Sequence, residues 1–202
     1  MAINDLDSSL VTTGNPVDGG SCYTSFESGA ALPTDATTKM STLSGFESLG
    51  ELSDNGFTES KSVSTETKKG WHGTSLLVVT TDEDKKYKAE FVEVNRPAVA
   101  KLRYGADNVT AGTDGSVSKI EDRFGVDITV PLVFDELESS GYLRRTVVKK
   151  ARVTSFDDVG HKKGDLIMYG MEFTVLDPGD GSPAVTIYRA KPAASSGAGT
   201  GK

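Results

Sequence analysis

The residues that could carry catalysis are few and far apart in this chain. His72 and His161 are the only histidines, and 89 positions separate them. Neither belongs to an HExxH pattern, which places two zinc ligands on one helix face. No serine stands in a Gly-x-Ser-x-Gly elbow, and no GxxxxGK[ST] loop is present to bind phosphate. The sequence therefore predicts no catalytic residue and no cofactor, with both histidines at ordinary surface or satisfied positions.

Metal and redox chemistry are equally poorly supported by the residue types. Cys22 is the single cysteine, so neither an intrachain disulfide nor a cysteine-based zinc cluster can form. Asp82–Asp84 could be imagined as a cation site, but Lys85 and Lys86 follow at once, which is typical of a solvated turn. The segment DPGDGS, 177–182, lacks the 12-residue ligand spacing of a calcium loop. We expect turns at both places and no metal.

A basic stretch at 142–156 is the best argument for a nucleic-acid-binding face. Strand alternation would divide its cations between two faces, and no aromatic side chains are interleaved for base stacking. Ion pairing with acidic residues of the same chain or a neighbour is the preferred interpretation. The cations concerned are Arg144, Arg145, Lys149, Lys150 and Arg152.

The charge balance also argues against a DNA-binding protein. The 202 residues contain 29 acidic and 22 basic side chains, a formal charge of -7. Residues 1–70 hold ten acidic against four basic side chains, whereas the remainder is nearly neutral. Because non-specific DNA affinity comes from cations that neutralise phosphates, we expect this protein to repel DNA or to be indifferent to it.

The chain shows no sign of a membrane or secretory destination. No apolar run approaches the roughly 20 residues that span a bilayer. The N-terminus MAINDLDSSL has neither the basic start nor the apolar stretch of a signal peptide. We expect a soluble protein made in a cytoplasm, without a membrane partner.

The hydrophobic pattern predicts an all-β domain, a sandwich or barrel, with one short flanking α-helix. The helix is expected at 95–104, with Asn95 as N-cap, Pro97 in the first turn and Gly105 after the end. Ser53–Gly56 (SDNG) is expected to end a strand, and Asp82–Lys86 to turn between two strands of a hairpin. The expected strands are 21–28, 43–52, 76–81, 87–94, 107–111, 115–119, 126–134, 142–156, 166–176 and 185–189.

One segment, Phe57–Gly70 (FTESKSVSTETKKG), has no apolar face, whether it is read with the 3.6-residue period of a helix or the two-residue period of a strand. Val63 is its only apolar residue after Phe57. Such a segment is either an exposed loop or a strand arm that is buried only against another chain. The expected organisation is an N-terminal arm (1–20), a β domain (21–190) that includes this polar arm, and a flexible Gly/Ser-rich tail (191–202).

An ordered set of motifs resembles one known family, the major tail tube proteins of long-tailed, siphovirus-type bacteriophages. The resemblance covers residues 21–190 in the right order. The N-terminal 20 residues and the tail have no firm counterpart. The matching stretches are ALPTDATT (31–38), FESLGELSDNGFTES (46–60), KKGWHG (68–73), FVEVNRPAVAKLRYG (91–105) and YLRRTVVKKARVTSFDDVGHKKGDLIMYGMEFTVL (142–176).

The resemblance implies a structural virion protein. Members of this family form hexameric rings that stack into the tail tube, through which DNA passes at ejection without specific binding. Assembly in the host bacterial cytoplasm is implied, as are the tape measure, tail terminator and distal tail proteins as partners. A lumen with excess carboxylates would fit the charge of -7. The candidate subunit-interface residues are Phe57, Glu59, Lys61, Ser64, Glu66, Lys68, Lys69 and Trp71.

Three alternatives remain open from the sequence alone. A contractile phage tail, a gene transfer agent or a secretion tube would use the same fold, and a neighbouring sheath gene would identify a contractile system. A monomeric carbohydrate-binding sandwich would need a planar row of exposed aromatic residues, whereas the one Trp and six Tyr are scattered. An enzyme is disfavoured by the missing catalytic groups.

Overall fold

The computed structural model describes residues 7, 10–17 and 20–192. The remainder of the predicted N-terminal arm and residues 193–202 of the predicted tail lie outside the described residues. The described chain contains eleven strands, one α-helix and short 3-10 turns. The elements are β1 (Gly14–Pro16), β2 (Cys22–Ser25), β3 (Phe46–Ser48), β4 (Leu52–Lys69), β5 (Ser75–Phe91), α1 (Pro97–Tyr104), β6 (Val109–Ala111), β7 (Val117–Ile120), β8 (Thr129–Glu138), β9 (Leu143–Phe156), β10 (Tyr169–Val175) and β11 (Val185–Ala190).

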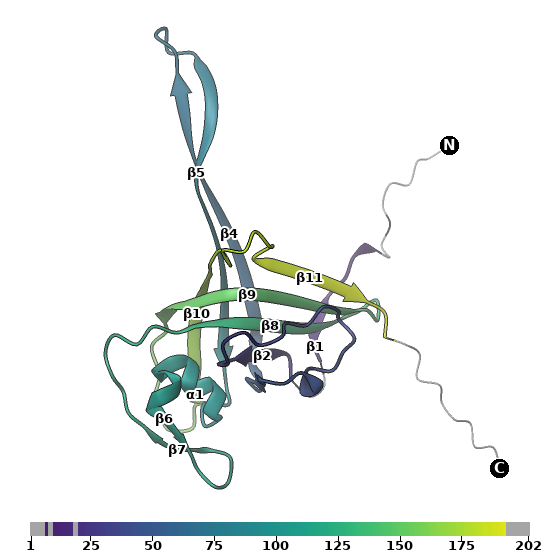
Figure 1. The fold of residues 1–202 in the computed structure, drawn as a ribbon, viewed down its shortest axis with the longest axis vertical. Coiled ribbons are helices and arrows are strands. Elements are labelled where there is room, and N and C mark those ends of the chain that lie inside the picture. Colours follow the sequence, from purple (N-terminus) through teal and green to yellow (C-terminus); the bar gives the residue numbers. More distant parts are fainter. Residues whose placement is uncertain (1–6, 8–9, 18–19, 193–202) are drawn as a thin grey trace, which may run out of the picture.

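Nine of the strands form one antiparallel sheet, built around β8 and β9 (Figure 1). Its main path runs β3-β2-β8-β9-β10-β5-β4. β1 adds to the same edge of β8 as β2, and β11 adds to the same edge of β9 as β10. β6 and β7 pair separately beside α1. The prediction of a mostly β chain with one flanking α-helix is confirmed.

The sheet curls around its main core, so that β4 at one end of the path faces β8. The ring of Phe57 on β4 stacks on the ring of Phe134 on β8, with centroids 4.3 Å apart. α1 covers the core with Val99 and Leu102, which are three positions apart and so lie on one face of the helix. The helix begins at Pro97 with Arg96, not Asn95, at the N-cap. The largest fully buried side chains are Tyr87, Phe91, Phe134, Phe173, Leu49, Leu102, Leu132 and Met171.

The strand expected at 126–134 is present as β8, which begins at Thr129 and runs on to Glu138. Alternate residues face the main core, namely Ile128 just before the strand and Val130, Leu132 and Phe134 within it. The register between β8 and β9 shifts at Pro131, a residue type that sheets tolerate mainly at edges and bulges. Val126, at the start of the expected range, is exposed because it lies before the strand.

Two turn predictions are wrong. Asp82–Lys86 continue β5 without interruption, since Asp84 lies opposite Ser62 and Lys85 opposite Lys61 on β4. Ser53–Gly56 lie inside β4 as a large bulge, where they stand against Glu90 alone. Pairing with a long partner strand outweighs local turn preference at both places. Gly56 accommodates the bulge with a φ of 63°, a conformation that glycine adopts readily.

A buried ion pair fixes the ALPTDATT loop to the sheet. The Arg145 guanidinium donates to both carboxylate oxygens of Asp135, each at 2.7 Å. Its third nitrogen donates to the backbone carbonyls of Asp35 (3.0 Å) and Thr38 (2.8 Å). Asp35 in turn accepts from the hydroxyl of Thr38 and from the backbone N–H groups of Thr38 and Thr37, and these bonds hold the pKa of its carboxyl below the ordinary range. One arginine therefore joins β8, β9 and the loop.

We expect Arg145→Met to lower the free energy of unfolding by about 3–5 kcal/mol, because Asp135 would keep a buried charge without a partner. The matched control is Arg152→Met, whose partner Asp127 is exposed, and it should cost less than about 1 kcal/mol. Urea unfolding of both variants measures the difference. Equal losses would show that the Arg145 pair has no special structural role.

Candidate subunit interface

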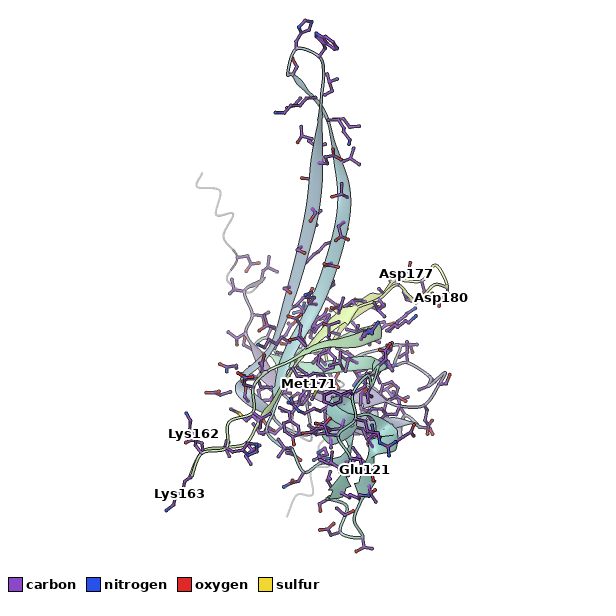
Figure 2. All side chains as sticks on the ribbon, turned by 90° about the vertical axis from the view of Figure 1, so that its left-hand side faces the viewer. Glu121, Lys162, Lys163, Met171, Asp177 and Asp180 are labelled. Carbon is purple, nitrogen blue, oxygen red and sulfur yellow. The ribbon has the colours of Figure 1, made fainter. Side chains whose placement is uncertain are left out.

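The β4–β5 hairpin leaves the domain as a long arm (Figures 1 and 2). The strands pair from Phe57 opposite Ala89 to Lys69 opposite Ser75. Every residue of 58–69 and 71–84 is exposed. Among the described strands, this part of the hairpin pairs only within itself, since β10 leaves β5 at Lys86. We define residues 58–84 as the arm. The polar segment Phe57–Gly70 is therefore extended strand as far as Lys69 and not a loop.

An aromatic stack holds the root of the arm. The ring centroid of Tyr87 lies 5.4 Å from that of Phe134 and 6.4 Å from that of Phe57. Burial, followed by the charge of Glu59, raises the pKa of Tyr87 above its ordinary value, so the phenol stays neutral within the stack. Beside the stack, Lys86 pairs with Glu172 at 3.0 Å. The arm is therefore anchored at one end only.

The part of the arm next to the domain, residues 58–65 and 80–84, is called the stem. Apart from Val63 its side chains are polar, and cross-strand ion pairs join its two strands. Diagonal cross-strand pairs join Lys61 to Glu83 at 2.5 Å and Lys85 to Glu59 at 2.6 Å. Pairs of this kind contribute only about 0–1 kcal/mol each when they are solvated. Because an isolated two-stranded hairpin is at best marginally stable in water, the stem gains little stability from its own contacts.

The distal part of the arm exposes apolar side chains. Trp71 at the tip is 100% exposed. Leu77 and Val79 lie opposite Lys68 and Glu66, whereas Val78 lies opposite Thr67 on the other face. Leu76–Val79 are all exposed, so both faces carry apolar groups. We call Trp71 and Leu76–Val79 the apolar head, a cluster of a kind that marks interaction sites in folded proteins.

The predicted interface residues divide into two groups in the structure. Phe57 is half-buried in the root stack, where it packs against the core. The other seven lie along the exposed arm. Sequence reasoning missed Leu76–Val79, which it assigned to the domain with all strands after Thr74. The available signal was their position directly after the tip, opposite a segment that could not bury them.

The remaining chemical candidates give no catalytic or metal-binding geometry. His72 lies in the tip and His161 in an exposed loop. The described residues hold no cluster of three metal-ligating side chains. Three of the five cations of the basic strand make the expected ion pairs, since Arg144, Arg145 and Arg152 pair with Glu136, Asp135 and Asp127. The only α-helix in the described ranges, α1, is too short to cross a bilayer.

Two alanine substitutions distinguish the contribution of the root of the arm to stability from that of its tip. We expect Phe57→Ala to lower the free energy of unfolding by about 2–4 kcal/mol, because it removes the ring that stacks on Phe134. Trp71→Ala should change stability by less than about 0.5 kcal/mol, because its ring contacts only solvent. Denaturant unfolding of the dilute protein measures both. A large loss from Trp71→Ala would contradict a free arm.

Comparison with known proteins agrees with this architecture. A search of curated proteins found no match. The family model described as phage tail tube protein matches residues 10–198, nearly the whole chain. That span includes the sheet, the helix and the full arm. Proteins of this family are structural components of the virion tail that assemble with themselves into a tube. This chain belongs to the phage tail tube protein family.

Proposed function

We propose that this chain is the major tail tube subunit of a long-tailed, siphovirus-type phage. Six copies would form a ring, and rings would stack into the tube that conducts DNA at ejection. The observation that carries the proposal is the arm, which places polar and apolar side chains at 58–84 outside the domain. Family membership supports the same conclusion.

The arm supplies the contacts that a stacked assembly needs. Its stem offers charges and hydroxyls, and its apolar head offers groups that become stable when a neighbour covers them. Many weak contacts repeated around a ring give strong overall binding without one large apolar patch on the free subunit. Neighbouring copies are therefore the proposed partners of Glu59, Lys61, Ser64, Glu66 and Lys69.

The other proposed partners act at the ends and in the lumen of the tube. The tape measure protein would occupy the lumen during assembly, and terminator and distal tail proteins would cap the two ends. DNA would pass through without specific binding, in keeping with a net charge of -7. Assembly would occur in the cytoplasm of the host bacterium, with no cofactor and no catalytic step.

Electron microscopy of the purified chain tests the proposal. Negative stain over a concentration series should show rings or tubes. Leu77→Glu should raise the concentration needed for tubes at least about 100-fold, because a charge buried without a partner in an interface costs several kcal/mol. Thr113→Glu, an exposed change in the β6–β7 turn, is the matched control. Unchanged tube formation by Leu77→Glu would contradict a role for the arm.

A further inference from the structure

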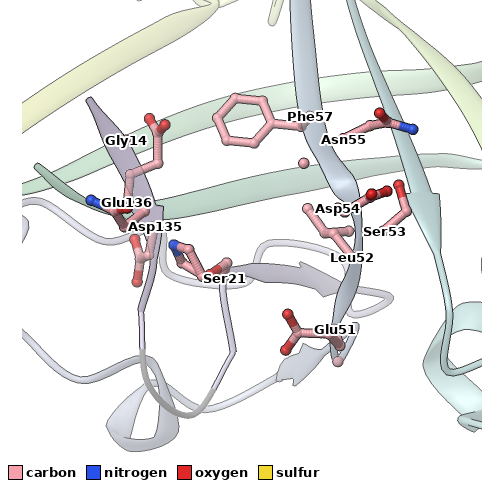
Figure 3. A pocket seen from close by; sticks show the side chains of 14 residues that line it. Gly14, Ser21, Glu51, Leu52, Ser53, Asp54, Asn55, Phe57, Asp135 and Glu136 are labelled. Carbon is pink, nitrogen blue, oxygen red and sulfur yellow. The ribbon is translucent and has the colours of Figure 1, made fainter. Parts of the chain in front are cut away.

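A groove beside the root of the arm is the largest unexplained surface feature near the hairpin (Figure 3). It has a volume of about 540 Å³ and lies between the Ser53–Gly56 bulge of β4, β1 and the end of β8. Leu52 and Phe57 supply apolar surface in its wall. The bulge that interrupts β4 therefore helps to form a recess large enough for an indole ring.

Acidic side chains surround this groove. Glu51 and Asp54 lie on the β4 side, with Asp135 and Glu136 on the β8 side (Figure 3). Asp135 is neutralised by Arg145, whereas the ion pair that Glu136 makes with Arg144 is long, with 3.8 Å between Oε2 and Nε. Burial raises the pKa of Glu136, so this contact does not fully compensate its charge.

The outer two carboxylates are also uncompensated. No ion pair among the described residues involves Glu51 or Asp54. The groove therefore combines apolar wall residues with three carboxylates that a cationic partner would stabilise.

The tip of the arm has the complementary composition. Residues 67–74 contain Lys68 and Lys69 but no acidic residue. Lys68 pairs with Glu66, and no described ion pair involves Lys69. Trp71, in the turn that follows them, is fully exposed. An aromatic ring flanked by cations fits an acidic groove with apolar walls.

The geometry excludes binding within one chain. Leu52 pairs with Phe91 at one end of the hairpin, and Lys69 pairs with Ser75 at the other. From Phe57 to Lys69 the strand extends about 40 Å at roughly 3.3 Å per residue. A tip can therefore reach only the groove of another copy. Such a head-to-tail contact uses two different surfaces, and it repeats along a filament.

We propose that the tip of one copy binds in the groove of a second copy, with Trp71 against Leu52 and Phe57. Lys68 and Lys69 then face the carboxylates of Glu51, Asp54 and Glu136. This inference rests on the proposed function, because it names the partner surface of the arm within the tube.

Disulfide trapping tests the contact and leaves Trp71 and the carboxylates in place. His72→Cys chains are mixed with Asn55→Cys chains, assembled together with wild-type chain and oxidised mildly. Both positions are exposed, whereas Cys22 is fully buried and burial raises the pKa of its thiol, so wild-type chain should not cross-link. The matched control pairs His72→Cys with Lys163→Cys, an exposed site in the β9–β10 loop.

A disulfide-linked dimer from the 72–55 pair, at least about tenfold more abundant than from the 72–163 pair, supports the proposal. Tubes that give no 72–55 dimer, or mainly a 72–163 dimer, overturn it while the tube function stands. Wild-type chain that forms neither rings nor tubes at any concentration contradicts the proposed function, and this inference with it.

Charge reversal provides a second measurement. Lys69→Glu should raise the concentration needed for tubes roughly tenfold, and combining it with Asp54→Lys should restore most of the loss. Lys162→Glu, in an exposed loop, is the matched control. Failure of Asp54→Lys to rescue Lys69→Glu would overturn the assignment of the groove.

Discussion

The stacked rings of Phe57, Tyr87 and Phe134 hold the root of the arm against β8, and the use of the arm depends on that attachment. β5 is a single strand that pairs with β10 from Phe91 to Lys86 and then continues beyond the domain. The core therefore fixes the direction of the hairpin, although it gives the distal residues no support. The buried root contributes stability, and the assembly contacts proposed above lie at the opposite end of the same two strands.

The composition of the arm limits non-specific aggregation of the free subunit. A long unpaired hairpin with apolar faces would aggregate before it met its proper neighbours. Here the stem carries Ser, Thr and paired charges with Val63 as its one apolar residue, and the other exposed apolar side chains of the arm lie at the far end. The acidic groove at the root has the opposite charge to the tip. Such complementarity would direct the apolar groups to one partner surface and disfavour others.

Sequence reasoning predicted a mostly β chain, α1 and the later strands β8 to β11, because each has a clear period or cap. The arm was indicated by the opposite signal, since Phe57–Gly70 has no apolar face and could be either an exposed loop or a strand arm. Sequence reasoning failed for β5, where Asp82–Lys86 has turn composition but is held extended by its register with β4. It also placed Leu76–Val79 in the domain, since an apolar strand has the same pattern whether it packs on its own core or on a neighbour. The groove depends on the bulge at Ser53–Gly56, and an Asn-Gly signal alone cannot distinguish a bulge from a turn.

Hydrogen exchange on the arm tests the central claim most directly, that its order comes from neighbouring copies. Amides of residues 60–69 and 75–84 are compared between the dilute subunit and the assembled protein, with β8 and β9 as internal references. The account predicts exchange near the unfolded rate in the dilute subunit, and slowing of about 100-fold or more after assembly, because a marginal hairpin becomes buried. Equal exchange of the arm in the two states would contradict it.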